Sequence, residues 1–76
     1  MMNEGHIRVK ILEVMQERGL SRTRLGQLAC LQRRQLNKLL DGSAIRVDFN
    51  VLARICNALD CKVEDILEYV PDKKTE

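Results

Sequence analysis

The chain has 76 residues, of which 45% are hydrophobic and 32% are charged, and its formal net charge is +2. A chain of this length forms one small domain, whose core buries only about 60% of the surface that the unfolded chain exposes. This composition excludes a disordered tail, and no apolar run approaches the length of a membrane span. The N-terminus lacks a basic segment followed by an apolar one, so we expect a cytoplasmic module without a secretory signal or membrane association.

The three cysteines, Cys30, Cys56 and Cys61, lack the CxxC spacing of metal and redox motifs. The single histidine, His6, precedes the first predicted helix, so the chain has too few ligands for a four-coordinate metal site. For the same reason, no serine has a histidine to act as its catalytic base. We expect the cysteines to pack in the core as small hydrophobic residues. We expect the protein to have no enzyme activity and to bind no metal, cofactor or small-molecule ligand. A redox role for Cys30 is a minor alternative, because basic residues lie near it in the sequence.

Positive charge is concentrated in the middle of the chain. Residues 6–46 hold nine Lys or Arg against three Asp or Glu, whereas residues 47–76 hold four against seven. Between Arg22 and Leu40 there are five basic side chains and no acidic one. Such a segment attracts polyanions, although a solvated basic face without a partner is the alternative interpretation.

The first predicted helix spans about residues 7–18 and ends at Gly19. Its apolar residues recur at the spacing of a buried helical stripe: Ile7, Ile11, Val14 and Met15. Ser21, a favoured N-cap, begins a second helix of about eight residues. Arg24 stands where a capping box has Glu or Gln, so this cap is a weak one.

The short link of residues 30–32 leads to a third helix over residues 33–40, which ends at Asp41 and Gly42. Its narrow apolar stripe consists of Leu36, Leu39 and Leu40. The remaining face carries hydrogen-bond donors and no acid: Arg33, Arg34, Gln35, Asn37 and Lys38. Folding does not require five such neighbours.

Asp48 caps a fourth helix over residues 49–59, and a fifth follows over residues 63–69, before Pro71. No strand signal was found, so the pattern predicts an all-α fold of five helices in one domain over residues 7–70. Residues 1–6 are expected to be a flexible leader and residues 71–76 a disordered tail.

Two short helices joined by a three-residue link, the second basic and amide-rich, are typical of a helix-turn-helix DNA-binding unit. The segment from Leu20 to Gly42 resembles the Cro and phage-repressor class of helix-turn-helix regulators, the XRE family. Residues 52–59 and 63–67 are similar to the two helices that complete the domain in that family. The resemblance implies a five-helix, lambda-repressor-like domain with its helix-turn-helix at residues 21–40, which binds double-stranded DNA.

Arg33, Arg34 and Lys38 are the residues that we expect to read bases, because the start of such a third helix reaches base edges in the major groove. Arginine pairs bidentately with guanine, so a G·C-containing half-site is expected, with about 1–3 kcal/mol of discrimination per good contact. Phosphate clamping alone is the alternative for each arginine. Residues expected to contact the DNA backbone or to support the third helix are Arg22, Thr23, Gln32, Gln35, Asn37, Ser43 and Arg46.

Three positions bear on how well the unit works. Gly26 stands where its two helices approach closely, which a small residue permits. Cys30 occupies a turn position that is glycine in much of the family, so the backbone there either avoids positive φ or is strained by about 1 kcal/mol or more. Asp41 replaces an asparagine that bonds phosphate in many relatives, and a carboxylate there repels DNA unless it is used in a local turn.

These observations favour a transcriptional regulator that represses by occupying an operator, as a homodimer on a two-fold related site. The fourth and fifth helices are the expected dimer interface, where Leu67, Tyr69 and Val70 form an exposed patch or, alternatively, close the monomer core. The alternative function is a protein-interaction module, antitoxin-like or an anti-repressor partner, that retains the fold without operator binding. RNA binding is disfavoured because the only aromatic residues, Phe49 and Tyr69, lie outside the basic segment.

Overall fold

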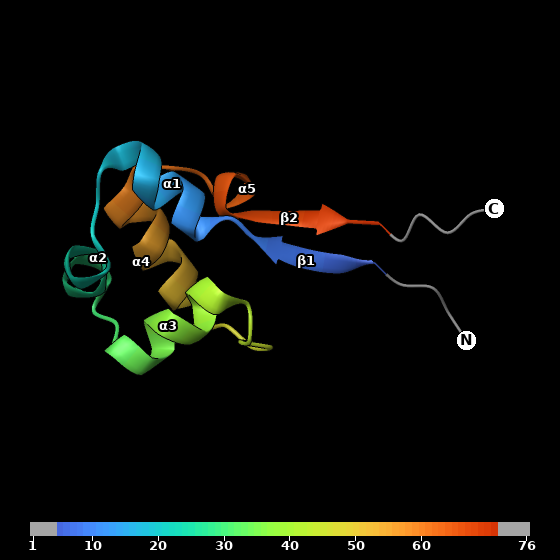
Figure 1. Cartoon of the computed structure of the whole chain (residues 1–76), viewed down its shortest axis with the longest axis horizontal. Helices are drawn as coiled ribbons and strands as arrows, with labels where there is room; N and C mark the ends of the chain where they lie inside the picture. Colours follow the sequence, from blue (N-terminus) through green and yellow to red (C-terminus); the bar gives the residue numbers. More distant parts are fainter. Residues whose placement is uncertain (1–4, 72–76) are drawn as a thin grey trace.

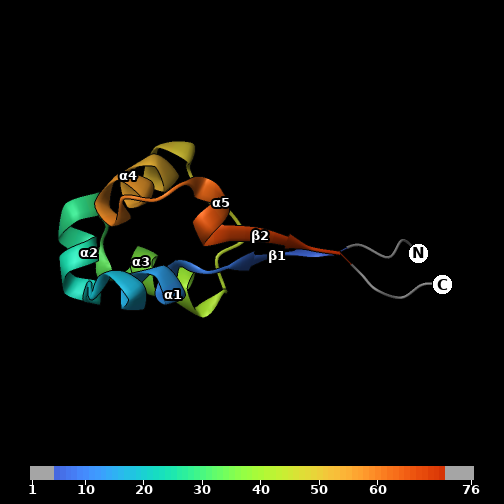
Figure 2. The same ribbon diagram turned by 90° about the horizontal axis from the view of Figure 1, so that it is seen from above.

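The computed structural model describes residues 5–71, which form five helices and two strands (Figure 1). In chain order these are β1 (His6–Val9), α1 (Ile11–Arg18), α2 (Arg22–Ala29), α3 (Arg33–Asp41), α4 (Phe49–Leu59), α5 (Val63–Ile66) and β2 (Leu67–Val70). The helices form one body, and the strands project from it as a ribbon, which Figure 2 shows edge-on. Helix α4, with 11 residues, is the longest, and none of the helices described is long and apolar enough to cross a membrane.

The core fills the space that the helices enclose. Helix α2 packs most extensively against α4, and α1 contacts α3, α4 and α5. The largest fully buried side chains come from four helices: Ile11, Leu25, Ile55, Leu59 and Ile66. Each contributes about 1.5–3 kcal/mol relative to an exposed side chain. Helix α3 joins the same core through Leu36 and Leu39, so all five helices contribute to it.

The helix ends confirm the predicted caps. The Ser21 hydroxyl accepts a hydrogen bond from the Arg24 backbone N–H at 3.1 Å, without the reciprocal bond of a capping box. The Asp48 carboxylate accepts one at 2.7 Å from the N–H two residues along. Gly19 and Gly42 end α1 and α3 in the left-handed conformation, which glycine adopts without a steric cost.

Both ends of the described chain differ from the prediction. Residues 7–9, expected in the first helix, belong to β1, and residues 67–69, expected in the last helix, belong to β2. The strands pair antiparallel, with His6 opposite Val70 and Val9 opposite Leu67. The all-α expectation is therefore only approximately right. His6 also lies in β1 rather than in a leader, while residues 1–4 and 72–76 lie outside the described part of the chain.

The cause of this error is that the pairing is long-range. Residues 6–9 and 67–70 have the partial alternation of polar and apolar side chains that suits a strand exposed on one face. However, Ile7 also continues the 3.6-residue stripe of α1, and the partner strand lies about 60 residues away. No local pattern reveals such a pairing.

Arg8 links the ribbon to the helices. Its guanidinium donates to Glu68 on β2 at 3.0 Å and to Glu13 on α1 at 2.7 Å. All three side chains are about half exposed, so each ion pair contributes at most about 1 kcal/mol. The Lys10 N–H continues the ladder by donating to the Ile66 carbonyl at 2.7 Å. An isolated two-stranded sheet is marginally stable in water, so these links to the body are needed.

Candidate nucleic-acid interface

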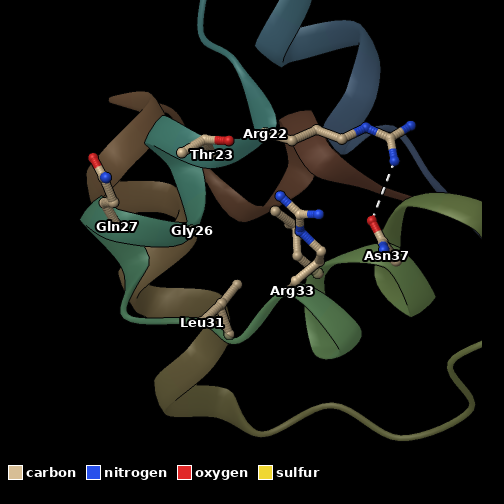
Figure 3. Close-up of a pocket in the computed structure, with 8 residues that line it drawn as sticks. Arg22, Thr23, Gly26, Gln27, Leu31, Arg33 and Asn37 are labelled. Atoms are coloured by element: carbon tan, nitrogen blue, oxygen red, sulfur yellow. Dashed lines mark hydrogen bonds between the residues drawn. The ribbon is translucent and has the colours of Figure 1, made fainter.

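Helices α2 and α3 meet around an open groove of about 520 Å³. Its lining combines polar side chains from both helices with a few apolar ones: Arg22, Thr23, Gly26, Gln27, Leu31, Arg33, Leu36 and Asn37 (Figure 3). Leu31 and Leu36 are buried and join the two helices through the core. The polar residues of the lining are exposed, so their hydrogen-bonding groups can reach a ligand from solvent.

Gly26 makes the close approach possible. A Cβ atom at this position would lie 3.3 Å from the Leu31 carbonyl oxygen and 3.8 Å from Leu36 Cδ2. The first distance is shorter than ordinary contact, and the atom concerned is backbone, which cannot rotate away. The geometry therefore supports the prediction that a small residue is needed here. The nearest atom to Gly26 belongs to Leu31, in the turn that links the two helices.

Arg22 and Asn37, both predicted to support the third helix, are joined by a hydrogen bond. Arg22 Nη1 donates to Asn37 Oδ1 at 3.2 Å, across the groove from the start of α2 to the middle of α3 (Figure 3). One amide oxygen uses only part of the five-donor guanidinium, so Arg22 keeps donors for an anion. Arg33 extends from the first turn of α3 into the same groove (Figure 3).

Arg34 and Lys38 occupy the outward face of α3. They stand four residues apart, opposite the buried Leu36 and Leu39, because successive residues turn by about 100° around a helix. Both side chains are exposed. Lys38 also borders a second, smaller groove of about 150 Å³ beside the loop before α4, together with Gln35 and Arg46. The three residues predicted to read bases are thus divided: Arg33 lies toward α2, and the other two face outward.

Two of the predicted supporting residues, Gln35 and Ser43, are engaged in local bonds. The Gln35 side-chain oxygen accepts from the Gln32 N–H at 3.3 Å and so helps to begin α3. The Ser43 N–H donates to the Asp41 carboxylate at 2.9 Å, beyond the end of the same helix. Gln35 keeps its amide N–H₂ for a ligand, whereas Ser43 shapes the turn.

The Asp41 carboxylate is used in a local turn, which is one of the two roles that the sequence allowed for it. Its pKa is lowered, first by hydrogen bonds from Ser43 and further by the positive charges of Lys38 and Arg22. The carboxylate therefore stays ionised at neutral pH. Because Asp41 is exposed at the end of α3, it places one negative charge beside the basic side chains.

Cys30 adopts the left-handed conformation, with φ +56°, and ends α2. It is exposed, which corrects the expectation of a core residue, and a non-glycine residue in this conformation costs about 1–3 kcal/mol. Arg54 stabilises this end of α2 by donating to the Ala29 carbonyl at 2.8 Å. Cys56 and Cys61 are half-buried, and burial raises the pKa of the Cys61 thiol to about 11. In residues 5–71 no three potential metal ligands cluster together.

Several arginines have structural roles that the sequence did not reveal. Arg18 donates to the Leu59 carbonyl at 2.8 Å and to the Asp60 carbonyl at 3.1 Å, and so caps α4. Its partners lie about 40 residues away, so no spacing indicates them.

Both salt bridges found within the described residues belong to Arg8, so the basic side chains of α2 and α3 have no carboxylate in salt-bridge contact: Arg22, Arg24, Arg33, Arg34 and Lys38.

A helical body with five exposed basic side chains on two short adjacent helices is typical of small helical DNA-binding domains. Residues 10–72 match the Cro/C1-type HTH DNA-binding domain family. The match covers most of the chain, and the chain therefore belongs to this family. The resemblance found in the sequence is confirmed.

Individual relatives agree with this assignment. The chain is 33% identical over 67 residues to the HTH-type transcriptional regulator YozG of Bacillus subtilis (strain 168), an alignment that covers 88% of this chain and 80% of YozG. Among solved structures, it is similar to the transcriptional regulator VanUg, with a TM-score of 0.72, 24% identity and 92% of each chain covered. The second similarity concerns the fold alone.

Proposed function

We propose that the chain is a sequence-specific, double-stranded DNA-binding transcriptional regulator that represses by occupying its operator as a homodimer. In this proposal α2 and α3 are the helix-turn-helix, and α3 enters the major groove. The observation that carries the proposal is the set of five exposed basic side chains on these two helices, none in salt-bridge contact with a carboxylate within residues 5–71. Family membership supplies the independent support.

The geometry suggests a role for each candidate. Arg34 and Lys38 point away from the body and would reach base edges first. Arg33 lies nearer α2 and would contact either a base or a phosphate. Arg22, oriented by Asn37, would bind a phosphate, because its remaining N–H groups suit a phosphate oxygen. Thr23, Gln32, Gln35, Ser43 and Arg46 would contribute backbone contacts or hold the turns.

The test is selection of bound duplexes from a random pool at fixed salt, with the intact protein, Arg34→Ala and Lys38→Ala. We expect the intact protein to enrich a two-fold related motif and each variant to lose preference at defined base pairs. Lys10→Ala is the matched control, since Lys10 lies beside Glu13, Glu17 and Asp65 and away from α3. It removes the same charge and should leave the motif unchanged.

A second measurement separates this function from a protein-interaction module. DNA affinity should fall steeply with salt, because each neutralised phosphate releases counterions. Failure to enrich any motif, together with an affinity that depends little on salt, would contradict the proposal and favour the interaction module. A reporter gene under the selected operator then tests repression, which requires expression to fall when the protein is present.

A further inference from the structure

The ribbon of β1 and β2 has one apolar face that continues outward from the core. Side chains alternate across a strand, so the paired residues Val9 and Leu67 share a face with the paired residues Ile7 and Tyr69. Val9 and Leu67 are half-buried and pack against the core. Ile7 and Tyr69 lie further along the ribbon, where the helical body does not cover them, and are 57% and 61% exposed. The face is apolar along its length, but its outer half, at Ile7 and Tyr69, is exposed to solvent.

The hydrogen-bond pattern shows which backbone groups point away from the ribbon. The Lys10 N–H donates to the Ile66 carbonyl directly opposite, so this position is a hydrogen-bonded pair. Hydrogen-bonded pairs alternate along an antiparallel ladder, so Arg8 and Glu68 form the next such pair. The N–H and C=O groups of Ile7 and Val9 consequently point outward from the free edge of β1. An edge of this kind is a template for another strand.

An apolar groove of about 540 Å³ lies along that edge. It is lined by all four residues of β1 but by only Leu67 of β2, and its other wall is the loop between α3 and α4 (Figure 1). This loop and the start of α4 contribute Ile45, Val47 and Phe49, which are 91%, 39% and 85% exposed. Since β2 contributes one residue and β1 contributes four, the groove follows the edge of β1.

We infer that the free edge of β1 pairs with β1 of a second copy of this chain, and that the exposed apolar residues of the loop before α4 cover the joined strands. The inference rests on the homodimer of the proposed function and gives it an interface that differs from α4 and α5. The resulting sheet has the strand order β2, β1, β1 of the partner, β2 of the partner.

A second copy fits this edge because the edge is complementary to itself. When Ile7 lies opposite the same residue of the other copy, each donates its outward N–H to the other's carbonyl, as two-fold symmetry requires. The side chains then form a continuous apolar row of two isoleucines flanked by two tyrosines. Arg8 is already paired with Glu68 and Glu13, so an identical ribbon meets little repulsion.

The available area agrees with a small dimer. If a fully exposed aromatic side chain offers 150–250 Å², the five exposed residues Ile7, Ile45, Val47, Phe49 and Tyr69 together offer roughly 600 Å². A standard interface buries about 800 Å² on each partner. Backbone atoms of β1 would supply much of the difference, so we expect a dimer with a dissociation constant in the micromolar range.

The first test is sedimentation equilibrium of the full chain without DNA. We expect a concentration-dependent dimer, and a dissociation constant at least tenfold higher for Ile7→Lys and for Phe49→Ser. Val63→Lys is the matched control, because Val63 is also exposed and apolar but lies on α5, outside the groove; it should change the constant less than twofold. Melting curves identify any variant that has merely unfolded.

A cross-link tests the register directly. Ile7→Cys in a Cys30→Ser background should form a covalent dimer under a mild oxidant, since opposite residues of a hydrogen-bonded pair have Cα atoms about 5.5 Å apart, within disulfide range. Val63→Cys in the same background should not. A monomeric chain, or a dimer that Ile7→Lys leaves intact, overturns the inference. DNA selection distinguishes this failure from failure of the proposed function, because a monomer can still enrich a half-site, and a dimer can form without enriching DNA.

Discussion

The two ends of this molecule present opposite kinds of surface. At one end, α2 and α3 expose basic and amide side chains above a groove whose apolar residues are buried. At the other, β1, β2 and the loop before α4 expose large apolar side chains, and the charges of Arg8 on β1 and Glu68 on β2 are paired with one another. The first surface suits a polyanion, and the second suits an apolar partner.

This difference teaches that the position of a charge matters more than the net charge of +2. Arg8 and Arg18 belong to the basic segment of the sequence but serve the ribbon and the end of α4. The arginines and the lysine of α2 and α3 have no carboxylate in salt-bridge contact within residues 5–71, and Arg22 donates a hydrogen bond to the neutral Asn37. The predictions below test how far the two ends are independent.

The largest expected effect is on DNA binding alone. Replacing Arg33 and Arg34 together by alanine should weaken binding to the selected operator at least about 30-fold, since each good contact contributes about 1–3 kcal/mol. Fluorescence anisotropy with labelled duplex measures the loss. The melting temperature and the dimer dissociation constant should remain unchanged, because both side chains are exposed and neither lines the groove along β1. A change in either would show that the two ends are coupled.

Gly26→Val should damage the DNA-binding end through the fold. The added Cβ meets the Leu31 carbonyl at 3.3 Å and the branches extend further, so we expect about 2–3 kcal/mol of destabilisation. Urea denaturation followed by circular dichroism measures this loss. Gly26→Ala is the control: its helix propensity offsets much of the crowding, so its stability should stay within about 1 kcal/mol of the original. Equal losses for both variants would refute the role of the side-chain branches.

Asp41→Asn should sharpen the contrast by making the basic surface more positive. The carboxylate, whose lowered pKa keeps it ionised, repels phosphate, and an amide keeps the oxygen that accepts from the Ser43 N–H. We expect operator affinity to rise about three- to tenfold in anisotropy measurements, with the largest gain at low salt. Asp60→Asn removes the same charge at the end of α4 and should change affinity less than twofold.

The smallest effect concerns the strained turn. Cys30→Gly relieves the left-handed backbone at φ +56°, but glycine loses more conformational freedom on folding, so the net stabilisation should be about 0.5–1 kcal/mol, seen as a higher melting temperature. Asp60 has a similar φ of +53° at the end of α4. Aspartate tolerates this conformation better than cysteine, so Asp60→Gly should gain less. A larger gain at Asp60 would contradict this explanation.

The sequence predicted the parts of the fold that local chemistry determines. The caps Ser21 and Asp48, the glycine ends of α1 and α3 and the apolar stripes all depend on neighbours within a few residues. The ribbon and the carbonyl caps made by Arg18 and Arg54 depend on partners 25 to 60 residues away. Such partners are known only after the chain has folded.

For the candidate site, the sequence predicted which helices carry the basic side chains but not which of those side chains bond to neighbouring residues. It named both Arg22 and Asn37 as backbone-contacting or supporting residues, and the structure joins them by a hydrogen bond. It named Gln35 and Ser43 as backbone-contacting or supporting residues without indicating the local bonds that both make around α3. Whether a donor is already occupied depends on side-chain geometry, which residue types do not encode.

The ribbon has a consequence for the order in which the protein assembles. Its strands join segments about 60 residues apart, so pairing closes the longest loop of the described chain and carries the largest entropic cost of closure. Helical turns form from local contacts and precede it. We therefore expect the β1 edge to become rigid only in the final step of folding. A nascent chain would lack β2 until residues 67–70 had left the ribosome, so the proposed pairing of two β1 edges would have to wait for them.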